Sequence, residues 1–252
     1  MIIFQYFINI IYYLFFGLIL VVFHILQFVC LNLFGYQAHK KSVDLFNWFL
    51  VNNLRLLGTR FHISGKRDFE KNKPYIIIAN HQSMYDIPPI IWHLRKLHPK
   101  FISKKELGKG IPGISYNLRN GGSVLIDRDD PGQAEQAVRQ MGQYIKKHKR
   151  SVVIFPEGTR SRDGIPKRFA KGGLRYLLEE CPEAMILPVS IKNAWQLHKK
   201  GMFPLNIGVN YYMKIHQPLK ATDHSFDELH HQLEKTIHQS CHDHRSTSKP
   251  VT

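Results

Sequence analysis

The sequence predicts an α/β fold, a mixed sheet flanked by helices, with an N-terminal hydrophobic membrane helix region. Three observations predict it. The 252 residues are 44% hydrophobic and 21% charged, which is typical of a globular protein and excludes a disordered or collagen-like chain. The first charged residue is Lys40, so an uncharged apolar segment precedes a body of ordinary charge content. Within that body, short apolar runs alternate with amphipathic segments, which indicates strands separated by helices.

The first element is the apolar segment 1–39. It exceeds the roughly 20 apolar residues that a membrane span needs, and it lacks the positively charged start of a cleaved signal peptide. Lys40 and Lys41 follow it, so the positive-inside tendency places the body on the cytoplasmic side of the cell membrane. Four polar residues interrupt the run: Asn9, His24, Gln27 and Asn32.

Residues 45–57 are again rich in large apolar side chains. The leader therefore favours a membrane span, and the alternative is an interfacial anchor of two helices built from residues 1–39 and 45–57. A buried core helix is the weaker reading, because a body of this size offers too little surface to cover about 36 apolar residues.

We predict a main domain over residues 58–220 and a C-terminal helix with a polar, His-rich tail over 221–252. Apolar runs predict five strands, at 75–79, 123–126, 151–155, 185–191 and 207–215. Helical spacing of apolar residues predicts helices at 134–145 and 174–178.

The tail favours a solvated helix end running into a frayed terminus over a metal site. Its candidate ligands are His230, His231, His238, Cys241, His242 and His244. The cysteines Cys30, Cys181 and Cys241 have neither paired nor metal-binding spacing, so no metal is expected.

Positive charge is concentrated in one third of the chain. Between Arg95 and Arg175 there are 19 Lys or Arg and 7 Asp or Glu, an excess of 12 positive charges. The formal net charge of the whole chain is +16. Such a density attracts nucleic acid, an anionic bilayer or a phosphorylated substrate. The apolar leader favours lipid phosphates, to which each surface Lys or Arg contributes about 1 kcal/mol.

A first candidate catalytic pair is His81 and Asp86, which follow a predicted strand. On a regular helix a five-residue step would turn them about 140° apart. Pro88 and Pro89 suit the first turn of a helix, so the residues before them are free to loop and to bring Asp86 onto the imidazole. Such a pair leaves the second ring nitrogen as a general base. The alternative is a polar turn with Asp86 as helix N-cap.

Two further segments bring arginines to strand ends. Residues 154–161 contain Gly158, which permits close backbone approach, and Arg160, whose guanidinium suits a phosphate. Residues 121–128 end in Arg128. Each segment alone also fits a surface turn. The pattern G-x-G-x-x-G at 108–113 does not support a dinucleotide site, because Pro112 lacks the N–H that a phosphate-binding helix terminus needs.

Four strings occur in order between residues 75 and 191: NHQSMYD, LIDR, FPEGTRS and ILPVSI. They resemble the four motifs of the glycerolipid acyltransferases, most closely the 1-acylglycerol-3-phosphate acyltransferases that make phosphatidic acid. The resemblance implies a glycerol-3-phosphate acyltransferase-like fold. It also implies that His81 deprotonates the sn-2 hydroxyl of lysophosphatidic acid, that Asp86 orients His81, and that the hydroxyl attacks an acyl thioester without a covalent acyl-enzyme.

The same resemblance implies a substrate-binding set. Arg128 and Arg160 would hold the phosphate of the acceptor, helped by Lys105, while Glu157 and Gly158 would shape the acceptor site. The acyl donor would be acyl-CoA or acyl carrier protein, used as a co-substrate, and no cofactor is implied. The implied partners are a lysophospholipid, the donor and a phospholipid membrane, with no nucleic acid.

Two alternatives stay open. The first is the same chemistry on another acceptor, such as glycerol 3-phosphate or another lysolipid. The second is a non-catalytic, membrane-anchored module that binds anionic lipid or nucleic acid through its basic region.

Overall fold

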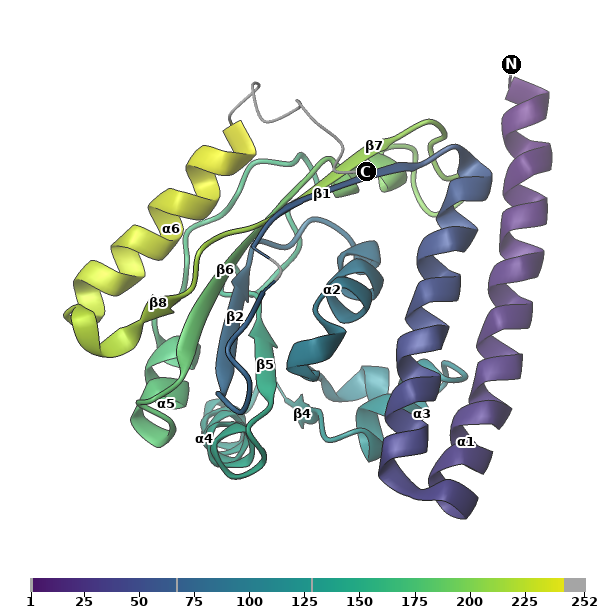
Figure 1. Ribbon diagram of the computed structural model, residues 1–252. Helices are drawn as coiled ribbons and strands as arrows, with labels where there is room; N and C mark the ends of the chain where they lie inside the picture. Colours follow the sequence, from purple (N-terminus) through teal and green to yellow (C-terminus); the bar gives the residue numbers. More distant parts are fainter. Residues whose placement is uncertain (1, 67, 128, 243–252) are drawn as a thin grey trace.

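An eight-stranded mixed sheet forms the centre of the molecule, with helices on both faces (Figure 1). The computed structural model describes residues 2–66, 68–127 and 129–242. The strands run in the order β1-β7-β6-β2-β5-β3-β4, and β8 pairs with β6. Their bounds are β1 Arg60–Gly65, β2 Tyr75–Ala79, β3 Pro99–Lys104, β4 Val124–Ile126, β5 Ser151–Ile154, β6 Met185–Lys192, β7 Asn210–Ile215 and β8 Leu219–Lys220. The helices are α1 Ile2–Leu54, α2 Ile87–His93, α3 Ile114–Asn120, α4 Pro131–His148, α5 Gly172–Glu180 and α6 Phe226–His242.

The central strands are parallel. β2 pairs in parallel with both β5 and β6, and β5 continues through β3 to β4 in the same direction. Every residue of β2 is buried, as expected for a strand covered on both faces. Ile77 lies in one core cluster with Ile90 of α2, whereas Ile76 lies in the opposite cluster with Met141 of α4 and Leu229 of α6. The carboxyl ends of five neighbouring strands, β6, β2, β5, β3 and β4, therefore meet at one edge.

The predicted fold class is confirmed, and the element boundaries differ in detail. β2 has the predicted bounds, while β4 and β5 are each one residue shorter than predicted. β7 begins only at Asn210, because Gly208 has φ 72° and ends the extended backbone before it. The sequence reading missed β1 and β3. Both strands mix polar with apolar residues and neither offers a continuous apolar run.

The N-terminal segment is a helical hairpin. The helical backbone of α1 is interrupted at Gly35, whose φ of 76° and ψ of −173° are not helical, so residues 2–34 and 36–54 form two arms that lie side by side (Figure 1). The ring of Phe23 on the first arm lies 5.4 Å from that of Phe46 on the second. Among the described residues one helix, α1 with its extension to Leu57, is long and apolar enough to cross a membrane.

The polar residues that interrupt the first arm face the main domain. The side chain of Asn9 donates to the Leu205 carbonyl at 3.1 Å and accepts from the Leu205 N–H at 2.8 Å. Further along, Nδ1 of His24 accepts from the Gly113 N–H at 3.2 Å, and Asn32 donates to the Tyr116 hydroxyl at 3.3 Å. The first arm is thus fastened to the main domain at both ends.

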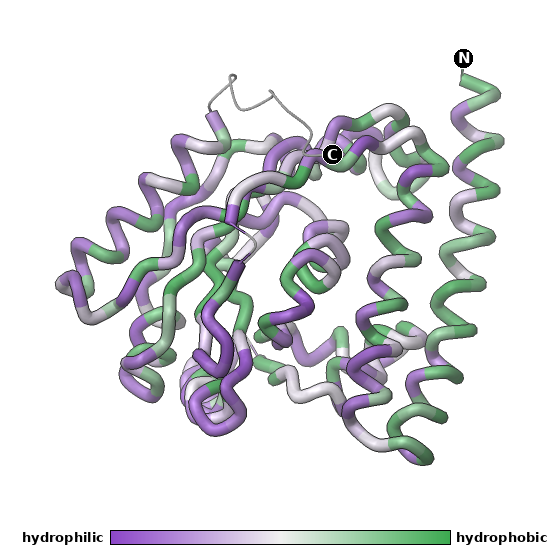
Figure 2. The backbone as a smooth tube through the Cα atoms, in the orientation of Figure 1, coloured by the Kyte–Doolittle hydropathy of each residue, from purple (hydrophilic) through white to green (hydrophobic). Residues whose placement is uncertain are grey.

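The opposite side of the hairpin is apolar and exposed, and hydrophobic residues dominate the first arm in Figure 2. Its exposed large side chains include Ile3, Phe4, Phe7, Leu14, Leu18, Val21, Ile25, Phe28, Leu33 and Phe34.

The glycine pattern at 108–113 is where the main domain meets the hairpin. Gly113 has φ 72°, and a Cβ there would lie 3.3 Å from the Leu20 carbonyl oxygen and 3.4 Å from the Phe46 ring. A glycine is required at this position both by conformation and by the close approach of α1.

The C-terminal helix packs one face on the sheet. His230 is buried in it, and the Cys241 thiol donates to the Ile191 carbonyl at 3.5 Å. His244 lies outside the described residues. Within the described ranges, no group of three His, Cys, Asp or Glu residues is arranged to hold a metal ion.

Candidate active site

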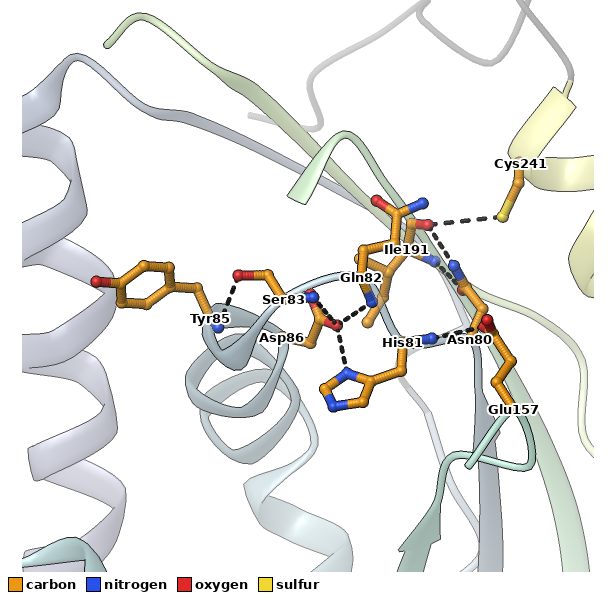
Figure 3. A network of polar contacts seen from close by, with 9 residues as sticks. All are labelled: Asn80, His81, Gln82, Ser83, Tyr85, Asp86, Glu157, Ile191 and Cys241. Atoms are coloured by element: carbon orange, nitrogen blue, oxygen red, sulfur yellow. Dashed lines mark hydrogen bonds and ion pairs between the residues drawn. The ribbon is translucent and has the colours of Figure 1, made fainter. Parts of the chain in front are cut away.

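The candidate catalytic residues lie just beyond the carboxyl ends of two adjacent parallel strands. His81 and Asp86 follow β2, and Glu157 follows β5 (Figure 3). In open α/β sheets, ligands usually bind in the crevice outside the carboxyl ends of the strands.

His81 and Asp86 form a hydrogen-bonded pair. Nδ1 of His81 lies 2.8 Å from Oδ2 of Asp86, and the side chain of Asp86 is 0% exposed while that of His81 is 17% exposed. Since a carboxylate only accepts hydrogen bonds, Nδ1 carries a proton, and in a neutral imidazole this leaves the lone pair on Nε2. Figure 3 shows Nε2 directed away from Asp86. The pair therefore presents a basic nitrogen at the edge of the sheet.

The loop between the two residues is shaped by the same carboxylate. Oδ2 of Asp86 also accepts from the Gln82 N–H at 2.7 Å and the Ser83 N–H at 2.9 Å. Ser83, not Asp86, is the N-cap of the short turn, since its hydroxyl accepts from the Tyr85 N–H at 3.1 Å. The N-cap alternative for Asp86 is therefore wrong in detail: its side chain caps no N–H of α2, and its Oδ2 instead completes the capping box of Ser83 and holds the imidazole.

The turn after β5 clamps His81 from three sides. The His81 N–H donates to Oε1 of Glu157 at 2.8 Å, and the Ser161 N–H donates to the His81 carbonyl at 2.8 Å. The ring of Phe155 stacks on the imidazole with centroids 4.1 Å apart. Oε2 of Glu157 accepts from the Lys167 N–H at 3.0 Å, and burial raises the pKa of this carboxyl. Both oxygens of Glu157 are thus engaged with backbone N–H groups.

Asn80 fixes the other side of His81. Its side-chain amide donates to the Ile191 carbonyl at 2.8 Å and accepts from the Ile191 N–H at 2.7 Å, so it continues the pairing of β2 with β6 past the end of β2 (Figure 3). Asn80, which directly precedes His81, is therefore bonded to β6 by two hydrogen bonds, and this limits movement of the His81 backbone.

The arginine predicted for phosphate binding is available in this turn. Arg160 is exposed, and its guanidinium makes no hydrogen bond or ion pair with any residue that the structure describes. Its carbonyl accepts from Nζ of Lys167 at 3.1 Å, which also donates to the Thr159 hydroxyl at 2.8 Å. Gly158 has φ 70°, a left-handed conformation that favours glycine, and no atom of a described residue lies within 4 Å of where its Cβ would be.

The remaining predicted binding residues lie at the ends of β3 and β4. Lys105 follows β3 and forms an ion pair with Asp127, which follows β4. Because these strands are parallel to β5, the pair lies at the same edge of the sheet as His81. Arg128 lies outside the described residues.

The sequence reading missed several residues that position the site. Phe155 and Ser161 are the first and last residues of the string FPEGTRS, but that string does not predict their contacts with His81. Tyr12 of α1 is fully buried and its hydroxyl donates to that of Tyr85 at 2.8 Å, one residue before Asp86. The ring of His198 stacks on Tyr85 with centroids 5.2 Å apart. No sequence pattern pointed to Tyr12 or His198.

His198 also lies within electrostatic range of the candidate site. Burial and, after it, the charge of Arg160 lower the pKa of this imidazole, while Asp86 opposes the shift. Tyr12 of the N-terminal helix and His198, after β6, therefore pack against Tyr85, next to the candidate catalytic residue Asp86.

The chain is similar to known proteins in both sequence and structure. A family model described as "Acyltransferase" matches residues 60–192. A 1-acyl-sn-glycerol-3-phosphate acyltransferase from Cocos nucifera is 28% identical over 222 residues, which are 87% of this chain and 66% of that protein. A protein of the same description from Saccharomyces cerevisiae is 29% identical over 192 residues, which are 73% of this chain and 59% of that protein. The chain thus spans less than two thirds of the length of either relative.

A solved structure matches over almost the whole chain. The crystal structure of the 1-acyl-sn-glycerophosphate (LPA) acyltransferase PlsC from Thermotoga maritima superposes with a TM-score of 0.81 at 25% sequence identity. The superposition covers 98% of this chain and 99% of that one, so the hairpin and the main domain both have counterparts there.

Proposed function

Because the chain belongs to the acyltransferase family, we propose that it transfers a fatty acyl group from an acyl thioester to the sn-2 hydroxyl of lysophosphatidic acid, giving phosphatidic acid. The observation that carries the proposal is the His81–Asp86 pair, 2.8 Å apart, with the unengaged guanidinium of Arg160 in the turn that clamps His81. The acceptor named in the descriptions of the relatives supports the choice of lysophosphatidic acid.

The proposed reaction needs one base and good positioning. Nε2 of His81 takes the proton of the acceptor hydroxyl as its oxygen attacks the thioester carbonyl carbon. The carbon–sulfur bond breaks, the new carbon–oxygen ester bond forms, and the leaving thiolate takes the proton from the imidazolium. The buried carboxylate of Asp86 stabilises the imidazolium while it exists. General-base catalysis of this kind contributes about 10²- to 10⁴-fold in rate.

The acceptor's phosphate is proposed to bind Arg160, with Lys105 and Arg128 as further cations. A guanidinium binds a phosphate through two parallel N–H···O bonds, and Arg160 has no competing partner among the described residues. The clamp that Glu157 forms on His81 supports a positioning role for that carboxylate instead of direct contact with the acceptor.

An acceptor screen tests the reaction class and the acceptor together. The wild-type protein is incubated with labelled acyl-CoA or acyl carrier protein and with lysophosphatidic acid, glycerol 3-phosphate or a lysolipid with a head group, and the lipid products are extracted. We expect labelled phosphatidic acid to be the main product. A preference for another acceptor would keep the chemistry and reject lysophosphatidic acid, whereas no transfer to any acceptor would support the non-catalytic module.

Replacing Arg160 with alanine is expected to raise the KM for lysophosphatidic acid by about 10- to 100-fold, because one or two charge-assisted hydrogen bonds to the phosphate are lost. The KM for the donor should change little. Arg175→Ala, which removes a guanidinium that lies over the Phe226 ring, serves as the matched control. Equal increases in both KM values would remove Arg160 from the phosphate site.

For the membrane, we propose the two-helix interfacial anchor, although the leader alone favoured a span. A span would place Asn9 and Asn32 near opposite surfaces of the membrane, so the main domain bonded to both would have to pass through the hydrocarbon, where unsatisfied polar groups cost several kcal/mol. A hairpin that lies in one leaflet buries only its exposed apolar side and leaves these contacts intact. The cytoplasmic side, predicted from Lys40 and Lys41, remains a prediction.

Depth measurements separate the two arrangements. A fluorophore is attached at Phe7→Cys, Leu18→Cys or Phe28→Cys in a Cys30→Ser background, and quenching by lipids with nitroxides at two depths is measured. An in-plane helix predicts similar, shallow depths at all three positions. A span predicts that the label at position 18 lies deepest and that the other two lie near opposite surfaces, which would reject the interfacial anchor.

A further inference from the structure

A cluster of cations lies at the elbow of the hairpin, far from His81. We define the elbow cluster as Tyr36, Lys40, Lys100 and Arg150. Tyr36 directly follows the break at Gly35, Lys100 lies at the start of β3, and Arg150 directly precedes β5. Lys100 is paired in register with Val152 of β5, so the cluster lies at the amino ends of these strands and the catalytic residues at the opposite edge.

The cations gather around one aromatic ring. The guanidinium carbon of Arg150 lies 4.3 Å from the centroid of the Tyr36 ring, and the ammonium of Lys100 lies 5.3 Å from it. The Tyr36 hydroxyl is 2.8 Å from Nε2 of His98, which holds the ring in place. Cation–π contacts of this kind offset only part of the cost of removing a charge from water.

The elbow cluster holds more positive than negative charge. The one carboxylate within electrostatic range of Lys100 in the described structure is Asp44, and it is paired with Lys40. Arg150 donates to the Tyr144 hydroxyl and forms no ion pair with a described carboxylate. The side chain of Lys100 therefore shares its surroundings with two other cations.

Lys100 is the most confined member of the cluster. It is only 7% exposed, and its ammonium donates to no acceptor in the part of the chain that the structure describes. Burial, then the charges of Arg150 and Lys40, lower its pKa to about 7. An ammonium that is largely removed from water and lies among other cations is costly, so an anion that bound beside it would be favoured.

The surroundings of the cluster match a lipid surface. Leu33 and Phe34, two and one residues before the break at Gly35, are 73% and 70% exposed. Apolar surface therefore lies next to the positive charge of the elbow cluster, in which Lys40 and Arg150 are half-buried and Lys100 is buried. A phospholipid presents the same succession, from acyl chain to phosphate.

We propose that the elbow cluster binds a phosphate group between Lys100 and Arg150, supplied by a phospholipid head group or by free inorganic phosphate. The phosphate oxygens accept from the ammonium and from the guanidinium and neutralise the excess charge. The site is separate from the proposed catalytic phosphate contacts, and it does not depend on the reaction proposed above.

A thermal-shift experiment with inorganic phosphate tests the site. The detergent-solubilised full-length protein carries Arg160→Ala throughout, to weaken the catalytic phosphate site, and the ionic strength is held constant. We expect phosphate to raise Tm, to lose this effect when Lys100→Met is added, and to retain it with Lys96→Met, a matched change at an exposed lysine nearby. The affinity for phosphate should fall about tenfold or more in the Lys100→Met protein.

The same variants separate a phosphate site from a structural lysine. Without phosphate, Lys100→Met should leave Tm unchanged or raise it, because an unpaired buried charge is replaced by an apolar side chain of similar length. A Tm that falls without phosphate, an absent phosphate response in the Arg160→Ala parent, or equal losses with Lys96→Met and Lys100→Met would each overturn the proposal.

Vesicles identify the source of the phosphate. Binding of the otherwise wild-type protein and of its Lys100→Met and Lys96→Met variants is compared on phosphatidylcholine vesicles with and without phosphatidylglycerol. A lipid source predicts that Lys100→Met alone loses most of the preference for anionic vesicles. A free-phosphate source predicts the thermal-shift result with equal vesicle binding by all three proteins. Acyl transfer by Lys100→Met in detergent should match wild type, so a failure of this proposal is distinguishable from a failure of the proposed function.

Discussion

Replacing His81 with alanine is expected to lower kcat for acyl transfer by about 10²- to 10⁴-fold, the range that a general base contributes. The substitution removes the nitrogen that takes the acceptor's proton, while the backbone bonds from His81 to Glu157 and Ser161 do not involve the side chain. The fold should therefore persist. The measurement is kcat with lysophosphatidic acid as acceptor, with Tm recorded for the same preparation.

Asp86→Asn tests the charge of the pair separately from its hydrogen bonds. Oδ1 of Asp86 is buried and has no hydrogen-bond partner among the described residues, so an amide NH₂ can occupy its place while the amide oxygen keeps the three bonds of Oδ2. The imidazolium then loses its stabilising charge, and we expect a fall in kcat of about 10²-fold or more.

Controls for this pair come from elsewhere in the molecule. His62→Ala, at the edge strand β1, removes an imidazole that stacks on Tyr212 and should leave kcat within about twofold of wild type, as expected for a surface substitution. If His81→Ala folds normally and retains more than about one tenth of the wild-type kcat, the general-base role is wrong.

Replacing Glu157 with alanine is expected to lower kcat by about 10²-fold while the KM for lysophosphatidic acid stays near wild type. The carboxylate accepts from the N–H groups of His81 and Lys167, so its removal frees the backbone of the base, and a displacement of about 1 Å in a reacting group costs about this much. Glu157→Gln keeps one acceptor oxygen and should lose less.

This experiment decides between two roles for Glu157. The family resemblance implies that Glu157 shapes the acceptor site, which predicts a rise in the acceptor KM, whereas the clamp predicts a fall in kcat alone. Glu234→Ala is the matched control, because Glu234 also accepts a backbone N–H, that of Phe169 in the same loop, at 2.7 Å. A higher acceptor KM with unchanged kcat in the Glu157 variants would contradict the positioning role.

The order of the motifs and the buried strands could be predicted from sequence because both depend on local patterns. The five apolar residues of β2 and the Pro88–Pro89 start of α2 lie where the sequence predicts them. The five-residue spacing of His81 and Asp86 in a loop allowed either a pair or an N-cap, and the family resemblance implied the pair; the structure places their side chains 2.8 Å from each other. Short-range geometry restricts such a loop strongly.

Tertiary structure alone assigns the contacts that join distant segments. Glu157 meets the backbone of His81 because β5 pairs with β2, and nothing in either motif states that pairing. Tyr12 reaches Tyr85 across 73 residues because the hairpin folds back on the domain. In the sequence, Asn9 and Asn32 interrupt an apolar segment. In the structure, their side chains form hydrogen bonds that hold this helix against the main domain.

The sequence by itself determined the fold class, the apolar leader and the identity of the residues that carry the proposed chemistry, since composition, periodicity and motif strings are properties of neighbouring residues. Only the tertiary structure decided which face of the leader is exposed, what Glu157 binds, and that Lys100 is buried among other cations. The physical reason is that burial and partnership depend on which segments are brought together in space, and strand order and helix packing set that arrangement only after the whole chain has folded.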